Sequence, residues 1–168
     1  ISDRIHAPLT YGEFTPYLSC GPDAEETGVV ITSSSKSFNL AGLKAALLIT
    51  QGAKMAARAD KCPPGMHWRT SILGAFAMAE AYTNGRQWLD TTVATLDENR
   101  RHLKAELERL LPDVGYELPE SGYLAWLDFS KVDVTTARIF DEAKVALVPG
   151  PDMGGERYDS WARLNFGT

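Results

Sequence analysis

Side chains that could do covalent or ionic chemistry gather between residues 32 and 44. They are Ser33, Ser35, Lys36 and Lys44. The runs 29–31 and 45–49 on either side are apolar and predict buried strands. A lysine between two buried strands is costly to place unless its amine is paired with a charge or used covalently. The spacing alone also allows a solvated loop in which the lysine keeps its head group in water.

Three more polar side chains stand beside predicted strands near the two ends of the chain: Asp3, His6 and Arg163. Taken singly, each has an ordinary structural interpretation. An aspartate commonly caps a turn, a histidine can be satisfied within the fold, and an arginine can lie on the surface. Their chemistry therefore depends on the elements that position them.

The composition is that of a globular protein able to bury one sizeable core, or one core and a small lobe. The 168 residues are 44% hydrophobic and 23% charged, with a net charge of −5. The scattered charges leave no basic patch for nucleic acid. No apolar run approaches the roughly 18 residues of a membrane span, so neither nucleic acid nor membrane is an expected partner.

The two cysteines, Cys20 and Cys62, lie far apart and lack CxxC spacing. This usage favours reduced thiols and a cytoplasmic location. Cys62 and His67 have no second Cys/His pair, so a zinc site is not expected.

The apolar pattern predicts helices at 53–60, 71–82 and 86–111. The last has apolar residues at spacings of three, four and seven, and its charges fill the other faces. At 1.5 Å per residue such a helix spans nearly 40 Å, roughly enough to leave one lobe and enter another. Beyond it, strands at 115–118, 123–129, 145–148 and 161–166, a helix at 135–144 and a glycine-rich loop at 150–155 predict a small α/β lobe.

Together, these residues resemble the class I/II aminotransferase superfamily, the fold-type I enzymes dependent on pyridoxal 5′-phosphate (PLP). The similarity rests on Ser2-Asp3-Arg4-Ile5-His6, on Ser33-x-x-Lys36-x-Phe38-Asn39-Leu40-Ala41-Gly42-Leu43-Lys44, and on Arg163-Leu164-Asn165-Phe166. The first two motifs are most similar to the cystathionine β-lyase, or C–S lyase, subgroup. The resemblance implies an α/β, aspartate aminotransferase-like fold: part of a large PLP-binding domain at 1–85, a connecting helix at 86–111, and an incomplete small domain at 112–168.

The resemblance also implies a role for each candidate residue. Lys36 would form a Schiff base with the cofactor and then act as a base at the substrate α-carbon, helped by partial burial and a neighbouring cation. Asp3 would face the pyridine nitrogen, and Arg163 would bind the substrate α-carboxylate through a bidentate fork. The cofactor phosphate would be held by Ser33 and Lys44, with a further hydroxyl from Ser35. His6 stands where many aminotransferases carry a tyrosine, so its contribution to cofactor binding stays open.

The implied reaction is β-elimination from cystathionine or a related cysteine S-conjugate, giving a thiol, pyruvate and ammonia. A class I/II aminotransferase begins with the same proton removal and is an alternative. A non-catalytic aminotransferase-like module is a more distant one. Ser33-x-x-Lys36 also matches the S-x-x-K motif of serine acyl-enzymes, but the K-T-G and S-D-N partners of that motif are absent.

The chain opens on Ile1 and ends in strand-like sequence, which favours a carboxyl-side piece of a longer enzyme. The glycine-rich phosphate turn and the ring-stacking aromatic residue of the superfamily belong to its earlier half. We therefore expect the isolated chain to bind PLP poorly and to be inactive. Relatives are usually homodimers, and the resemblance implies the same here.

Overall fold

The computed structural model describes residues 1–167 and contains two compact units. The first comprises Ile1–Thr92, and the second begins at Val93. The domain boundaries expected from the resemblance stay a prediction. Within the described residues, no helix has the length and apolar content needed to cross a membrane.

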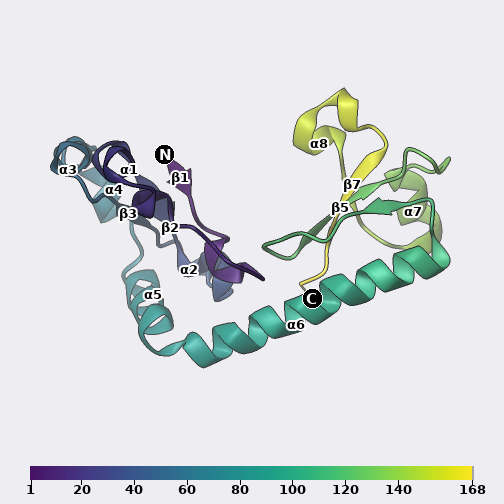
Figure 1. The fold of residues 1–168 in the computed structure, drawn as a ribbon, viewed down its shortest axis with the longest axis horizontal. Helices are drawn as coiled ribbons and strands as arrows, with labels where there is room; N and C mark the ends of the chain where they lie inside the picture. Colours follow the sequence, from purple (N-terminus) through teal and green to yellow (C-terminus); the bar gives the residue numbers. More distant parts are fainter. Residues whose placement is uncertain (168) are drawn as a thin grey trace. The chain divides into compact units, whose positions relative to one another are not determined.

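A three-stranded sheet forms the centre of the first unit (Figure 1). Its strands are β1 (Ser2–Asp3), β2 (Val30–Thr32) and β3 (Leu47–Ile49), in the order β1-β2-β3. β1 pairs with β2 in parallel, and β2 pairs with β3 in antiparallel register, with Thr32 opposite Leu47. The crossover from β1 to β2 carries two 3-10 turns, η1 (Ala7–Leu9) and η2 (Tyr17–Ser19), and the helix α1 (Pro22–Thr27).

The strand predicted at 45–49 is present but is not buried along its length. Ala45 is buried, whereas Leu47, Leu48 and Ile49 are each about 40% exposed. β3 stands at the edge of the sheet, and no described strand covers its outer side. The apolar run therefore predicted the strand correctly, but its prediction that the strand is buried was wrong.

Between β2 and β3 the chain forms the one-turn helix α2 (Ser34–Ser37) and the 3-10 turn η3 (Ala41–Leu43). Lys36 therefore lies in a helical turn rather than in a simple loop. Its side chain is exposed, and the partial burial expected for its amine is absent from the described chain.

Four helices follow β3: α3 (Ala53–Ala59), α4 (Gly65–Trp68), α5 (Ile72–Asn84) and α6 (Arg86–Leu110). Gly85 separates α5 from α6. The short α4 lies in a stretch for which the sequence analysis predicted no helix. α6 is the long teal helix of Figure 1, and it matches the predicted 86–111 helix within one residue.

The second unit packs an antiparallel sheet on α6. Its strands are β4 (Gly115–Tyr116), β5 (Leu124–Asp128), β6 (Val148–Pro149) and β7 (Trp161–Asn165), in the order β4-β5-β7-β6. The helices are α7 (Thr136–Ala143), α8 (Pro151–Gly154) and the 3-10 turn η4 (Glu156–Tyr158). The loop predicted at 150–155 thus contains a helical turn, because Pro151 is well suited to a first helical position.

Successive side chains of β5 and β7 point alternately to a buried face and to an open face of the sheet. Ala125, Leu127 and Ala162 are no more than 3% exposed and form the core side. On α6, Leu96 and Arg100 are buried as well. Arg100 donates to the carboxylate of Asp97 at 2.6 Å and to the carbonyl of Pro119 at 2.8 Å, so its charge is paired where it is buried.

Candidate active site

The helical turn that carries Lys36 is organised by Ser33. This residue is the N-cap of α2, with extended backbone, and its hydroxyl accepts from the backbone N–H of Ser35 at 3.0 Å. The same hydroxyl donates to the carbonyl of Ala45 at 2.6 Å. Ser33 is 3% exposed, so these bonds form away from water and tie the start of α2 to Ala45, two residues before β3.

The hydroxyls of Ser33 and Ser35 also contact each other at 2.6 Å. Because Ser33 gives its proton to Ala45, Ser35 is the donor in this contact. The Ser35 hydroxyl is half-buried and can rotate toward a ligand, whereas the Ser33 hydroxyl is held by backbone groups on both sides. Of the two serines predicted to bind the phosphate, Ser35 therefore has the hydroxyl that is more available to a ligand.

The carboxyl end of α2 is anchored by Phe38. Its ring stacks on Trp88 with centroids 5.6 Å apart and meets the edge of Tyr82 at 5.8 Å. A Cβ at Gly85 would lie only 2.6 Å from the Phe38 ring, so glycine at this helix junction leaves room for the anchor. The turn bearing Lys36 is thus fixed at both ends.

Two residues in the segment from Lys36 to Lys44 have left-handed backbone. Asn39 has φ 55° and Lys44 has φ 53°. Such conformations are costly for residues other than glycine and gather at functional sites. The segment is held against α5, because a Cβ at Gly74 would meet the Leu43 carbonyl at 2.2 Å. The backbone strain is therefore supported by close packing.

A pocket of about 970 Å³ opens beside this segment within the first unit. Four of the predicted site residues line it: Ser33, Ser35, Lys36 and Lys44. Neither lysine side chain forms an ion pair or hydrogen bond within residues 1–167. Two unpaired amines and two hydroxyls in one pocket form a site suited to an anion and to an electrophile that reacts with amines.

The far wall of the pocket includes residues that sequence reasoning missed as site residues. They come from α3, α4 and the adjoining turns, and include Asp60, Cys62, His67 and Arg69. Their sequence shows no ligand-like spacing. The pairing of β2 with β3 brings the start of β3 beside the lysine turn, and no local signal in residues 60–69 indicates that they line the same pocket.

Asp3 and His6 lie beside the lysine turn but do not line the pocket. The Asp3 carboxylate is exposed and accepts from the backbone N–H of Ile5 at 3.0 Å, which is the turn-capping role that the residue alone suggested. Burial lowers the pKa of His6 below its ordinary value of 6.5, and the positive charge of Lys36 lowers it further. Asp3 opposes this shift, so both charges lie close enough to affect the imidazole.

Arg163 belongs to the second unit, on the open face of β7. Trp126 of β5 and Val148 of β6 stand opposite it in the two neighbouring strands. Its guanidinium contacts the sulfur of Met153 at 3.2 Å. Within the described residues it has no carboxylate partner.

Comparison with known proteins identifies the family. The profile for aminotransferase class I and II matches residues 1–168. The chain belongs to this family. It is 37% identical to a cystathionine beta-lyase of Corynebacterium glutamicum, over 99% of this chain and 45% of that protein. The chain thus spans less than half the length of this relative.

Solved structures of relatives have the same fold as this chain. A Corynebacterium diphtheriae protein superposes with a TM-score of 0.93 at 32% identity, covering 99% of this chain and 45% of its own. A PLP-bound C–S lyase of Staphylococcus hominis gives 0.86 at 27% identity, covering 99% and 42%. The resemblance and the fold-type I class predicted from the sequence are confirmed.

Proposed function

We propose that this chain supplies the lysine-bearing wall of a PLP site in a C–S β-lyase. The substrate would be cystathionine or a related cysteine S-conjugate, and the products a thiol, pyruvate and ammonia. The observation that carries the proposal is the pocket in which the unpaired amines of Lys36 and Lys44 meet the hydroxyl of Ser35. The names of relatives support the lyase over other reactions of the family.

The chemical groups that line the pocket are of the types that PLP requires. An aldehyde needs a primary amine, and Lys36 offers one that is exposed and has no partner within residues 1–167. A phosphate needs positive charge and hydroxyl donors, which Lys44 and Ser35 present in the same pocket. The pocket, at about 970 Å³, is at the large end of ligand sites.

When bound, PLP supplies an electron sink for negative charge at the substrate α-carbon. The amine of Lys36 is the base that removes the α-proton and can return one. Asp3 would face the pyridine nitrogen of the cofactor and favour its protonated form. Arg163 would bind the substrate carboxylate through a two-pronged contact.

The lowered pKa of His6 keeps its imidazole neutral at neutral pH. A neutral imidazole can accept or donate a hydrogen bond without adding a third positive charge to the two lysines. We propose that His6 serves the cofactor site in this neutral form.

An aminotransferase is the second candidate because the matching family profile is named for that activity. The two reactions share the first proton transfer and differ in what happens to the amino group. The experiment is to incubate the full-length protein with PLP and L-cystathionine and to measure pyruvate and amino-group transfer to an added keto acid. Pyruvate without transfer supports the lyase, and transfer without pyruvate supports the aminotransferase.

Covalent attachment tests the role of Lys36 directly. Borohydride reduction of the PLP-loaded full-length protein should add one cofactor mass to the peptide that contains Lys36. Lys36→Ala should lose this adduct. Lys54→Ala should retain it, because Lys54 is an exposed lysine of α3 paired with Glu26 at 3.7 Å. An adduct that persists in Lys36→Ala would remove the basis of the proposal.

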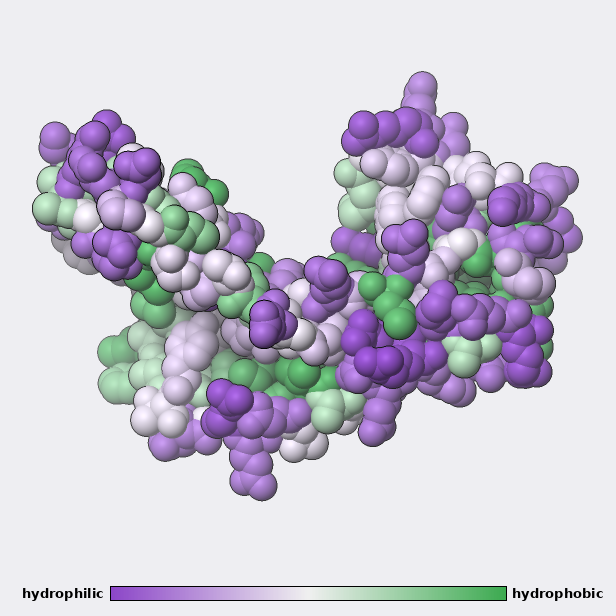
Figure 2. All heavy atoms as spheres, viewed as in Figure 1, coloured by the Kyte–Doolittle hydropathy of each residue, from purple (hydrophilic) through white to green (hydrophobic). Residues whose placement is uncertain are grey.

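We also propose a cytoplasmic homodimer. Ile72, Leu73 and Phe76 on α5 are each about 70% exposed, and Figure 2 shows green surface along the α5 region. Contiguous apolar surface of this kind is typical of protein contacts. Both cysteines are free thiols, which suits a reducing compartment. Sedimentation of the full-length protein and of an Ile72→Glu, Phe76→Glu variant tests the dimer: the variant should become monomeric.

A further inference from the structure

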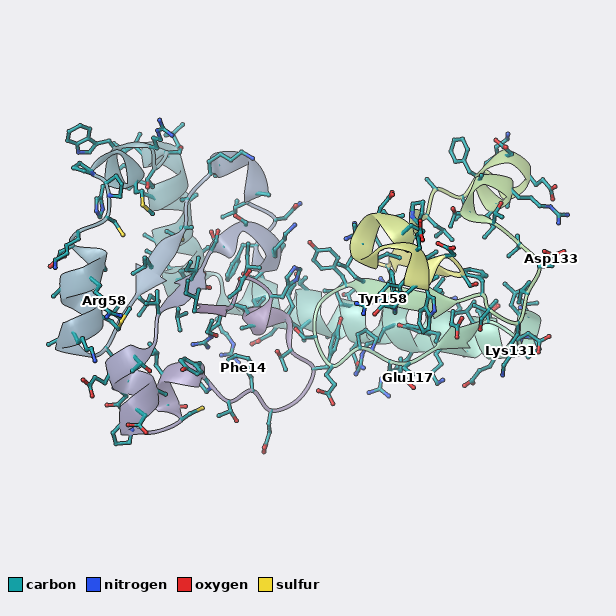
Figure 3. All side chains as sticks on the ribbon, turned by 90° about the horizontal axis from the view of Figure 1, so that it is seen from above. Phe14, Arg58, Glu117, Lys131, Asp133 and Tyr158 are labelled. Carbon is teal, nitrogen blue, oxygen red and sulfur yellow. The ribbon has the colours of Figure 1, made fainter. Side chains whose placement is uncertain are left out.

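On the open face of the second unit, Arg163 contacts the sulfur of Met153 and stands opposite one of three aromatic rings that pack on one another. Trp126 stacks on Trp161 with ring centroids 5.6 Å apart and planes inclined by 21°. Tyr158 meets the edges of both rings at 5.5 and 6.1 Å. Figure 3 labels Tyr158 beside the yellow segment that contains α8. We call Trp126, Tyr158 and Trp161 the aromatic cluster.

The aromatic cluster is locked by the fold around it. A Cβ at Gly154 would lie 2.4 Å from the Tyr158 ring, so the end of α8 packs directly on that ring. Trp126 and Trp161 stand on neighbouring strands in fixed register, opposite Arg163 and Asp128 respectively. The position of Trp126 is therefore set by two ring contacts and by the register of its strand before any ligand is bound.

Arg163 lies directly across from Trp126, so their side chains leave the sheet on the same face, with Cβ atoms roughly 5 Å apart. The nearest acidic residue on this face of β5, Asp128, accepts from the backbone N–H of Ser130 at 2.9 Å instead. Within residues 1–167, the guanidinium of the half-buried Arg163 has a sulfur contact but no anion.

We infer that Trp126 is a positioning residue for Arg163, which fixes the direction of the guanidinium fork toward the substrate carboxylate. The inference rests on the proposed function, in which Arg163 binds that carboxylate. Trp126 confines the flexible stem of the arginine between two strands and leaves fewer side-chain conformations to be lost on binding.

This role predicts a particular kinetic signature. Trp126→Leu in the PLP-loaded full-length protein should raise KM for L-cystathionine about 2- to 5-fold, as expected for loss of one cross-strand side-chain pair. kcat should stay within about 2-fold, because the lysine base is unchanged. Trp126→Phe, which keeps an aromatic plane, should restore most of the affinity. Phe140→Leu, which removes an exposed ring from α7, is the matched control and should leave KM unchanged.

A double-mutant cycle separates positioning from general damage to the fold. Arg163→Lys keeps the charge but removes the fork, and it should raise KM about 10-fold or more. Adding Trp126→Leu to Arg163→Lys should then change KM by less than about 2-fold, because there is no fork left to orient. Circular dichroism and melting temperature should be recorded for all variants.

Equal effects of Trp126→Leu with and without Arg163 would overturn the inference, as would an unchanged KM in the single variant. An unchanged KM in Arg163→Lys would show that Arg163 does not bind the substrate carboxylate, and the inference about Trp126 would fail with it. Absence of pyruvate from the unmodified protein would instead refute the proposed function, so the failures can be told apart.

Discussion

Replacing Ser33 by alanine should destabilise the lysine turn far more than removing a neighbouring buried hydroxyl. The Ser33 hydroxyl caps α2 through the Ser35 N–H at 3.0 Å and donates to the Ala45 carbonyl at 2.6 Å. Loss of an N-cap costs about 1 kcal/mol, and a buried carbonyl left without its donor costs about 1 to 3 kcal/mol more. We therefore expect the free energy of unfolding to fall by about 2 to 4 kcal/mol.

Ser37 provides the matched control. It lies in the same helical turn and is fully buried, but its hydroxyl has no hydrogen-bond partner within residues 1–167. Replacing Ser37 by alanine removes a buried polar atom that has no hydrogen bond. The free energy of unfolding should therefore stay the same or rise slightly.

Urea unfolding of the full-length protein without cofactor measures both variants, with circular dichroism as the signal and the denaturant slope checked for each. Equal losses for Ser33→Ala and Ser37→Ala would refute the cap-and-tether description of Ser33. The same pair also tests the site: Ser33→Ala should weaken PLP binding, measured by absorbance titration, whereas Ser37→Ala should not.

Three further predictions concern stability. Arg100→Ala should lower the free energy of unfolding by about 1 to 3 kcal/mol, because the Asp97 carboxylate and the Pro119 carbonyl lose their donor. Arg101→Ala, at an exposed position, should change it by less than about 1 kcal/mol. Similar losses for the two variants in denaturant titrations would contradict this. Gly74→Ala should destabilise by more than about 1 kcal/mol, since its Cβ would meet the Leu43 carbonyl at 2.2 Å, and an unchanged melting temperature would show that α5 can move away. His6 has a lowered pKa in the folded chain, so below its ordinary value of 6.5 the unfolded chain binds the proton first and stability falls as pH falls. His6→Gln should flatten that part of the stability profile, which unfolding at a series of pH values would reveal.

Local patterns were sufficient where neighbouring residues decide the structure. The apolar spacing of 86–111 located α6 nearly to the residue. In the lysine turn, Ser33 is a good N-cap type, yet the serines were read as a loop because a single turn of helix gives too short a period to detect.

Long-range register decided what the sequence could not predict. Nothing local to Arg163 indicates that Trp126 stands opposite it, since β5 and β7 are separated by more than thirty residues. The exposure of β3 has the same origin, because an apolar run reports a strand but not its place in the sheet. The residues grouped by the motifs as one site fall into two units, and the four that line the pocket all come from the segment 33–44.

The exposed edge of β3 also affects how the chain behaves outside its natural context. Leu47, Leu48 and Ile49 combine apolar side chains with backbone groups that no described strand pairs on the outer side. An uncovered apolar edge is a template for adding further strands, including those of other copies. Loss of solubility in preparations of these residues by themselves would therefore report strand addition at β3, without implying that either unit is misfolded.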